Sequence, residues 1–415
     1  MTKKSDAPAI RFKGFSDAWE QRKLGELVDR VVRKNTNNES TLPLTISAQY
    51  GLVDQITYFN NRVASRDVSN YYLVLNGEFA YNKSTSDGYP FGAVKRLDLY
   101  EKGVLSTLYI VFAPKKEQQI DSDYLTVFFD TDRWHKGVAE RAAEGARNHG
   151  LLNISAEDFF DIDLSVPKDI VEQKQIGAFI RQLDNLITLH QRKFEKLTNV
   201  KKSMLEKMFP QNGSSYPEIR FKGFTDPWEQ RKAIDIADYS KGNGYSKGDL
   251  TDAGTPIILY GRLYTKYQFA ISEVDTFAFP RNGAVYSQGN EVIVPASGET
   301  AEDIARASAV EKSGVLLGGD LNILRPFDFI NPLFLALAIS NGEPQKELAK
   351  KAQGKSVVHI HNTDIQEVTI AYPSRTEQDR IVSVFRQLDN LITLHQRELE
   401  KLQNIKKSML EKMFV

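Results

Sequence analysis

Three short stretches of the chain carry residue types that could do chemistry on a nucleic acid. Asn331-Pro332-Leu333-Phe334 approaches the (Asn/Asp)-Pro-Pro-(Tyr/Phe) loop of adenine methyltransferases, but it lacks the second proline and follows no glycine-rich cofactor turn. Residues 349–356 fit a relaxed phosphate-loop pattern, yet a helical segment precedes them and a strand-like VVHIH follows, which is the wrong order. His359 and His361 alternate on one strand face without a third ligand at metal-site spacing. We therefore predict neither a catalytic nor a metal site.

A second group of residues could bind DNA without reacting with it. Side chains that fork onto base edges read sequence, and Lys, Arg or Ser on phosphates fix position. Loops at matching places in the two halves of the chain contain such side chains. We predict DNA contacts by Lys83, Ser84, Thr85, Ser86, Arg147, Asn148, Gln49 and Tyr50 in the first half, and by Lys241, Tyr260, Arg262, Ser297, Lys355 and Ser356 in the second. Such residues also favour plain solvated turns, so the prediction depends on the matched sets.

The segments that must position these loops occur twice. IRFKGFSDAWEQRK at residues 10–23 returns as IRFKGFTDPWEQRK at residues 219–232, and we call these two segments the leading motifs. A second block, residues 181–209, returns almost unchanged at residues 386–414. Ahead of each copy lies a hydrophobic alternation that ends in proline, at Pro167 and Pro373, which is typical of a closing strand.

The segments between these shared blocks differ almost completely. Residues 30–147 and 239–354 keep only scattered similarity. The pattern predicts two related domains that present different surfaces on one repeated framework. Neutral drift after duplication would have changed the helices as much as the domains, so we expect a constraint on the helices.

The second block predicts a long helix in each half. Apolar residues and one histidine recur at intervals of seven, at Ile176, Leu183, His190, Leu197 and Met204 and again at Ile381, Leu388, His395, Leu402 and Met409. Phe179, Leu186 and Val200 are expected at the accompanying d position of the seam, with Ile180, Ile187 and Phe194 beside it. A helix over residues 172–208 would be about 55 Å long at ~1.5 Å per residue, too long for one domain to cover. Because the linker at residues 210–217 is short, we expect the two helices to pair antiparallel.

Polar positions of the helices also repeat, although a coiled coil alone would let its solvent faces drift. We interpret this as a face on which a partner protein docks twice, with recent gene conversion as the alternative. The residues that we assign to this face are Gln182, Asp184, Asn185, Arg192, Gln387, Asp389, Asn390 and Arg397.

Composition limits the class of protein. The chain of 415 residues is 41% hydrophobic and 26% charged, which is typical of globular domains. It has no cysteine and no apolar run that could span a bilayer, and its start lacks the apolar region of a secretion signal, so we expect a cytoplasmic protein. Lys and Arg number 54, as do Asp and Glu, so net charge indicates no partner.

Tandem variable segments separated by helices of the form RQLDNLITLHQR(K/E)xEKLxNxKKSMLEKMF resemble the specificity (S) subunit of type I restriction-modification enzymes. The resemblance covers essentially the whole chain. It implies that each variable domain recognises one half of a bipartite, gapped double-stranded DNA site. It also implies that the helices set the spacing and dock two methyltransferase subunits, joined by two motor-nuclease subunits for cleavage. S-adenosylmethionine, ATP and magnesium are then expected on the partner subunits, and no cofactor in this chain.

We therefore expect an α+β fold, with two pseudo-two-fold related α/β target recognition domains separated by two long antiparallel coiled-coil helices. The expected segments are a first domain (1–167), a central helix and linker (168–217), a second domain (218–373) and a distal helix (374–415). One rival function is a chain that also methylates or cleaves DNA. Another is a pseudo-symmetric coiled-coil scaffold that binds no DNA, which binding of a duplex with two spaced half-sites would exclude.

Overall fold

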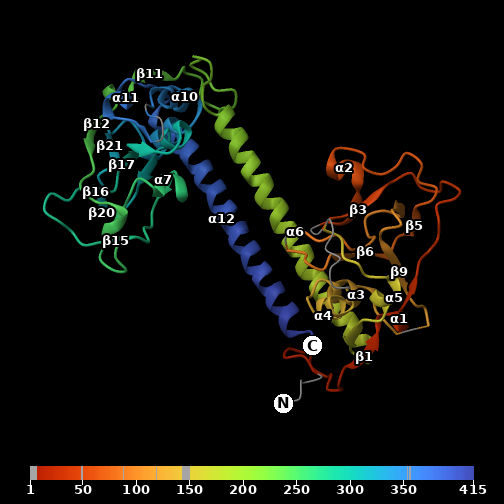
Figure 1. The fold of residues 1–415 in the computed structure, drawn as a ribbon. Coiled ribbons are helices and arrows are strands. Elements are labelled where there is room, and N and C mark those ends of the chain that lie inside the picture. The colour runs from red at the N-terminus through yellow and green to blue at the C-terminus, as the bar shows by residue number, and fades with distance from the viewer. Residues whose placement is uncertain are drawn as a thin grey trace. The chain divides into compact units, whose positions relative to one another are not determined.

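The computed structural model describes residues 7–47, 50–86, 88–117, 119–142, 150–352, 354 and 357–415. The chain folds as two compact units, the first of Met1–Gln191 with Arg397–Val415 and the second of Arg192–Gln396. Both boundaries fall inside the long helices α6 (Ile170–Lys207) and α12 (Arg375–Lys412). Each unit therefore contains one variable domain, the start of one long helix and the end of the other (Figure 1). In the part of the chain that the structure describes, no helix is long and apolar enough to cross a membrane.

The first unit is organised around an antiparallel sheet. Its strands lie in the order β2 (Val28–Arg30), β9 (Ile110–Pro114), β6 (Phe79–Asn82) and β7 (Ala93–Arg96). Two further strand pairs are β3 (Leu44–Ser47) with β4 (Gly51–Asp54), and β5 (Tyr72–Leu75) with β8 (Lys102–Leu105). The helices are α1 (Leu24–Leu27), α2 (Gln55–Phe59), α3 (Ser122–Phe129), α4 (His135–Arg141) and α5 (Ala156–Phe160). Large aromatic residues, among them Phe79, Phe112 and Phe159, fill the core beneath the sheet.

The second unit repeats this sheet with one strand added. Its order is β12 (Ala237–Lys241), β21 (Leu321–Pro326), β17 (Glu291–Pro295), β19 (Ser308–Val310) and β14 (Ala270–Ile271). A second sheet contains β15 (Phe277–Ala278), β13 (Thr255–Ile258), β20 (Ser313–Leu317) and β16 (Tyr286–Gln288), and a short pair joins β18 (Ser297–Gly298) to β22 (Val358–His359). The helices are α7 (Arg262–Thr265), α8 (Ala301–Ile304), α9 (Pro332–Ile339), α10 (Gly342–Lys351) and α11 (Asn362–Gln366). The shared strand order confirms the prediction of two related α+β domains.

The leading motifs are tied to the closing strands in the same way in both units. Strand β1 (Glu20–Lys23) pairs antiparallel with β10 (Asp163–Val166), and β11 (Glu229–Lys232) pairs with β23 (Thr369–Tyr372) in the equivalent register. In each motif the tryptophan before the strand is buried and packs edge-on against a phenylalanine just beyond a long helix. These pairs are Trp19 with Phe414 at 6.1 Å and Trp228 with Phe209 at 6.0 Å between ring centroids.

An arginine of each leading motif also holds the start of a long helix. Arg11 donates to both carboxylate oxygens of Glu172 at 2.6 and 2.8 Å, and Arg220 donates to both oxygens of Glu377 at 2.8 Å. The two carboxylates are buried, with side chains only 1% exposed. Because an uncompensated buried carboxylate is costly, each arginine stabilises the junction between motif and helix.

The next residue of each long helix, Gln173 or Gln378, fastens the helix to the domain. Gln173 accepts a hydrogen bond from the backbone N–H of Asp121, the N-cap of α3, and donates to Pro167 O. Gln378 makes the equivalent bonds to the N–H of Asn331, the N-cap of α9, and to Pro373 O. The Glu-Gln pair thus repeats because both of its side chains have structural partners in both units.

Within each unit the two long helices run antiparallel, as predicted, and equivalent ion pairs join them. In the first unit Lys406 lies 2.7 Å from Asp184, and in the second unit Lys201 lies 2.5 Å from Asp389. Burial lowers the pKa of Lys406, but the carboxylates of Asp130 and Asp184 outweigh this effect and raise it overall. Lys406 is thereby held in its charged form between the helix and the domain.

The predicted seam is partly wrong. The residues at intervals of seven are buried or half-buried throughout, but Leu186 and Val200, expected at the d position, are 43% and 38% exposed. The second row of the seam is the one expected beside the d position, Ile180, Ile187 and Phe194, and it continues to Lys201. A repeat of seven residues supports either row, so periodicity alone could not decide which apolar residues face the partner helix.

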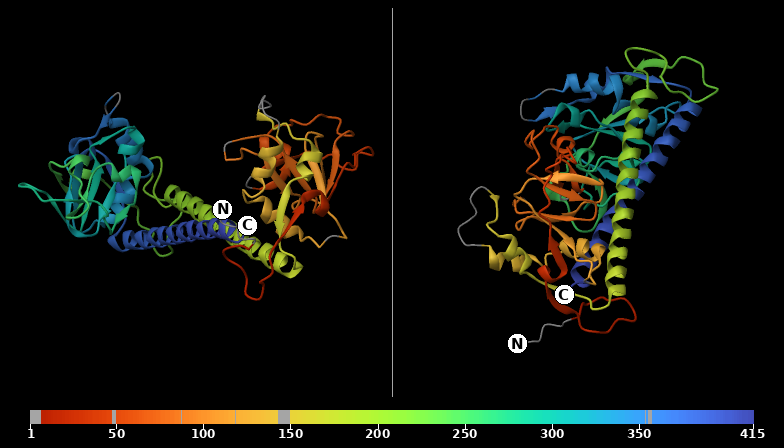
Figure 2. Two further views of the ribbon diagram at one scale, coloured as in Figure 1. Left: turned by 60° about the horizontal axis from the view of Figure 1, so that its bottom comes forward. Right: turned by 90° about the vertical axis from the view of Figure 1, so that its right-hand side faces the viewer.

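In both units the start of the leading motif is hydrogen-bonded to the end of a long helix. Ile10 N–H donates to Lys412 O, and Ile219 N–H donates to Lys207 O, so both leading motifs begin at the end of a long helix. Figure 2 shows the end of α12 beside the segment that leads into β1.

Candidate nucleic-acid interface

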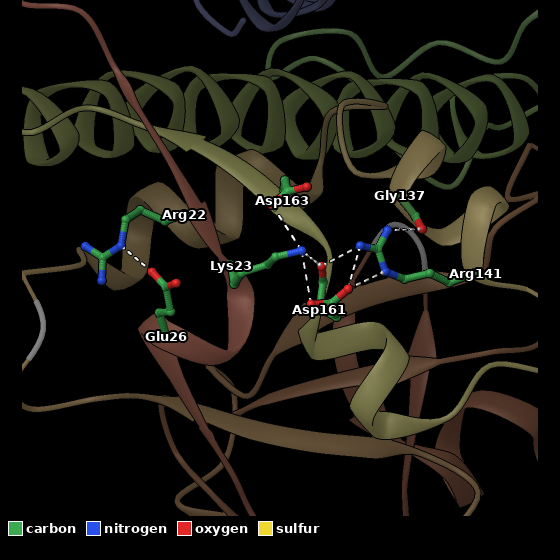
Figure 3. A network of polar contacts seen from close by, with 7 residues as sticks. All are labelled: Arg22, Lys23, Glu26, Gly137, Arg141, Asp161 and Asp163. Carbon is green, nitrogen blue, oxygen red and sulfur yellow. Dashed lines mark hydrogen bonds and ion pairs between the residues drawn. The ribbon is translucent and has the colours of Figure 1, made fainter.

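Polar networks fix the stems of the loops that we predicted to contact DNA. In the first unit Arg141, at the end of α4, donates to Asp161 O at 2.7 Å and Oδ2 at 2.8 Å. Lys23 of the leading motif reaches the same residue, with Nζ 3.0 Å from Asp161 Oδ1 (Figure 3). The hydrogen bond from Arg141, followed by that from Lys23, holds the pKa of the Asp161 carboxyl below its usual value.

The second unit has the equivalent network. Lys351, at the end of α10, lies 2.5 Å from Glu367, and Lys232 of the leading motif donates to Glu367 O at 2.5 Å. The contact with Lys351 lowers the pKa of Glu367. In both units the loop that follows this anchored helix end is one predicted to touch DNA, so the repeated framework determines where each variable loop begins.

The two strongest sets of predicted loops come together in each unit. Ser84 forms a β-bridge with Leu151, and Thr85 N–H donates to Gly150 O at 2.7 Å. In the second unit Ser297 pairs with His359, and its hydroxyl lies 3.1 Å from His359 Nδ1. Ser84 follows β6 as Ser297 follows β17, so the two serines occupy equivalent places.

Five of the predicted contacts cannot be placed. Gln49, Arg147, Asn148, Lys355 and Ser356 lie outside the residues that the structure describes. The described residues next to them, Tyr50, Gly150 and Val357, are all exposed.

In the first unit the remaining predicted residues fall into two places. Lys83 is half-buried and donates to Ile154 O at 3.3 Å, whereas Ser84 and Ser86 are exposed. Tyr50 is exposed at the turn between β3 and β4. The neighbouring Gly51 lies near the carbonyl oxygen of Arg96, at one end of β7. Asn82, which leads into Lys83, pairs with Ala93 at the other end of β7. The structure therefore separates Tyr50 from Lys83–Ser86 by the length of a strand.

In the second unit a glycine turn gathers the predicted residues. Gly318 touches Gly242, next to the exposed Lys241, and its N–H donates to Ile258 O near Tyr260. The turn also reaches the strand of Ser297, because Ala296 N–H donates to Asp320 O. These contacts bring three sets that are distant in sequence close together, although Ser297 itself is buried, with its hydroxyl against His359.

Arg262 has a different role from the predicted one. Its side chain is only 9% exposed, and it donates to Asp275 Oδ1 at 2.6 Å, Gln268 Oε1 at 3.2 Å and Glu273 O at 2.9 Å. Hydrogen bonds from Lys266 and then Arg262 lower the pKa of Asp275 to about 2. These contacts stabilise the loop after α7. Because they engage the guanidinium of Arg262, the structure does not support base contact by this residue.

The residues that resembled catalytic motifs have structural roles. Asn331 is the N-cap of α9, where its side chain accepts from the N–H groups of Leu333 and Phe334, and Pro332 occupies the first turn. His361 begins α11 with a capping box to Asp364. Among the described residues, no group of His, Asp and Glu has the arrangement of a metal site.

Most of the residues assigned to partner docking are exposed on the long helices. Gln182, Asn185 and Arg192 lie on the surface of α6, and Gln387, Asn390 and Arg397 lie on α12. Asp184 and Asp389 instead pair with the seam lysines, which gives an internal reason for their repetition. Beside the exposed polar residues lie exposed leucines that the prediction had missed or placed in the seam, Leu186, Leu189, Leu391 and Leu394.

The structure thus has two related α+β domains that present dissimilar loops on one repeated framework. A family model described as the type I restriction modification DNA specificity domain matches residues 17–199 and again residues 225–404. The chain therefore belongs to this family, and its function is that of a DNA-recognition subunit rather than a scaffold without DNA.

Similar proteins carry the same description. The type I restriction enzyme MjaVIII specificity subunit of Methanocaldococcus jannaschii is 22% identical over 368 residues, covering 85% of this chain and 82% of that protein. The crystal structure of a type I restriction-modification S subunit from M. genitalium aligns with a TM-score of 0.60 at 14% identity, covering 99% of both chains. At this identity the structural likeness concerns the fold.

Proposed function

We propose that each variable domain recognises one half of a bipartite DNA site, while the repeated framework holds both domains to a common complex. The observation that carries this proposal is the equivalence of Ser84–Leu151 and Ser297–His359. Loops of unrelated sequence are anchored at corresponding places in the two domains. Two loop sets of different chemistry recognise two different short sequences, and the unread DNA between them has a length set by the helices.

We further propose that this chain contributes recognition and no catalytic residue. Asn331, the nearest approach to an adenine-binding loop, has its side-chain oxygen engaged in capping α9. S-adenosylmethionine, ATP and magnesium would then be bound by the methyltransferase and motor subunits. Because the substrate is cellular DNA, the complex would work in the cytoplasm.

The exposed face of the long helices is the proposed docking site for two methyltransferase subunits and, through them, two motor subunits. Leu186 and Leu189 are 43% and 45% exposed, and their twins Leu391 and Leu394 are 44% and 52% exposed. Exposed leucines flanked by identical polar residues are costly unless another protein covers them. Since the same face occurs once on each helix, it fits two copies of one partner.

A methylation map of genomic DNA tests the recognition proposal. Cells with the partner genes intact should methylate one gapped, asymmetric adenine motif that disappears when this gene is deleted. Replacing residues 239–354 with those of another family member should change only one half of the motif. A motif that changes in both halves, or that does not depend on this gene, would overturn the proposal.

Partner docking is tested separately by the mass of the assembled complex. Leu186→Glu and Leu391→Glu should each remove one methyltransferase subunit, and the double variant should remove both. Leu99→Glu is the matched control, because Leu99 is a 61% exposed leucine in the first domain, away from the helices. Full assembly of the double variant would contradict docking on this face.

A further inference from the structure

The second domain exposes an aromatic side chain at each end of one loop. Phe279 is 67% exposed and begins the connection between β15 and β16, and Tyr286, which is 41% exposed, is the first residue of β16. In Figure 1 these strands are drawn at the end of the domain away from β11 and α11. Burying such a side chain would stabilise the fold by roughly 1.5 to 3 kcal/mol. Because Phe279 remains mostly exposed, its side chain contributes little of this stabilisation to the folded domain.

The loop is nevertheless held in one conformation by a neighbouring segment. The Tyr245 hydroxyl donates to Phe279 O at 3.3 Å and accepts from Arg281 N–H at 2.9 Å. Asn243 Nδ2 donates to Gly283 O at 2.7 Å. An aromatic side chain presented on a fixed backbone pays little entropy when a ligand covers it.

The segment that holds this loop carries exposed cations. Lys241 and Lys247 are exposed, and the guanidinium of Arg281 lies over the Tyr245 ring at 5.3 Å from its centroid. Asp249 of the same segment is ion-paired with Arg281 and accepts from Ser246 N–H at 2.8 Å. Exposed cations beside exposed aromatics suit a polyanion that also has flat apolar groups, which describes a nucleic acid.

The loop is also continuous with the surface that gathers the predicted DNA contacts. Asn243, which binds the loop, donates its own N–H to Leu317 O, and the adjacent Gly242 packs against Gly318. A side chain at Gly242 would collide with Gly318 O at 1.8 Å, so this close approach requires glycine. Residues 241–249 therefore connect the aromatic loop to the glycine turn.

We propose that the loop of residues 279–286 is a DNA-binding element of the second domain, with Phe279 packed against the bases and Lys241 and Lys247 on neighbouring phosphates. This proposal rests on the proposed function, since it assigns a contact surface to the half-site that the second domain recognises. Apolar side chains inserted at a base step increase the bound surface by deforming the duplex. The contact would then tighten binding while leaving most of the sequence choice to the other loops.

The test uses the complete complex with its methyltransferase and a duplex containing the methylated motif of the wild type. Binding is measured by fluorescence anisotropy at several salt concentrations. Phe279→Ala should weaken binding by about fivefold to 150-fold without changing the salt slope, and Phe279→Trp should bind within a few-fold of wild type. Lys247→Ala should lower the salt slope by about one unit. Tyr216→Ala, which truncates a 54% exposed aromatic on the linker, is the matched control and should bind like wild type.

Three results would overturn the proposal. Unchanged affinity of Phe279→Ala, while the wild-type complex prefers its motif, would remove this loop from the interface and leave the proposed function intact. Failure of Phe279→Ala to assemble with the methyltransferase in the absence of DNA would identify the loop as a protein contact. A wild-type complex without preference for any duplex would overturn both this proposal and the proposed function.

Discussion

The ion pair between Arg11 and Glu172 offers a sharp test of how the framework is held together. The Glu172 side chain is 1% exposed and that of Arg11 is 14% exposed, so replacing Arg11 by methionine leaves a carboxylate buried without its cation. Breaking a buried pair in this way typically costs about 3 to 5 kcal/mol. The same substitution at Arg220 should have the same effect in the second unit, because Glu377 is equally buried.

Hydrogen exchange read by mass spectrometry measures this cost in each unit separately. Amides at the start of α6 should exchange roughly two to three and a half orders of magnitude faster in Arg11→Met, since about 1.4 kcal/mol corresponds to a factor of ten. Amides at the start of α12 should keep their wild-type rates in this variant. Arg220→Met should give the reverse pattern, so each variant is the control for the other.

A double variant separates the cost of an orphaned charge from the cost of lost packing. With Arg11→Met and Glu172→Met together, no charge remains buried, and exchange should return to within about tenfold of wild type. If Arg11→Met accelerated exchange by less than tenfold, or if the double variant were as damaged as the single one, the pair would not be a desolvated link between motif and helix.

Three further predictions concern contacts within the two units. Lys406→Met should raise hydrogen-exchange rates near Asp130 and Asp184 more than Lys201→Met does near Asp389, because Lys406 contacts two carboxylates and Lys201 one. In carboxyl-carbon NMR, Asp275 should titrate near pH 2, and Arg262→Ala should move its pKa part of the way back toward 3.8. Since the folded-state pKa is the lower one, the stabilisation by Asp275 should be complete above about pH 4 and lost as pH falls through 2, and a midpoint near 4 in the wild type would contradict the ion pair. A circularly permuted chain that begins at residue 218, with residue 415 joined to residue 10 by a copy of residues 210–217, should fold with an unchanged circular dichroism spectrum, because Ile10–Lys412 repeats the contact of Ile219–Lys207.

The framework could be predicted from the sequence because each of its contacts leaves two copies of a motif. The leading motif, which occurs twice, indicated that some contact was made twice. The partners themselves were not predictable. A buried glutamate at the start of a helix becomes interpretable only when the fold brings an arginine from the other end of the domain within 2.6 Å of it.

The sequence predicted which loops of the candidate interface lie together, but it did not predict which individual residues are available to contact DNA. Matched loops correctly indicated neighbouring segments, as the pairing of Ser297 with His359 shows. Arginine is a residue type that often contacts bases, but the guanidinium of Arg262 is ion-paired with Asp275, which lies later in the chain. Gly318 and Phe279 carried no recognisable signal, because a glycine needed for close approach and an aromatic left exposed look ordinary until their surroundings are known.

Reciprocal pairing accounts for part of the near-identity of the two helices. Asp184 pairs with Lys406, and the twin of that lysine, Lys201, pairs with Asp389, the twin of the aspartate. A change in one copy therefore leaves a mismatched partner in the other copy, whereas a change in a DNA loop affects only its own domain. This argument does not extend to Leu186 and its exposed neighbours, which make no such reciprocal pair. For these leucines, the proposed docking of a partner once on each helix would supply a constraint from outside the chain.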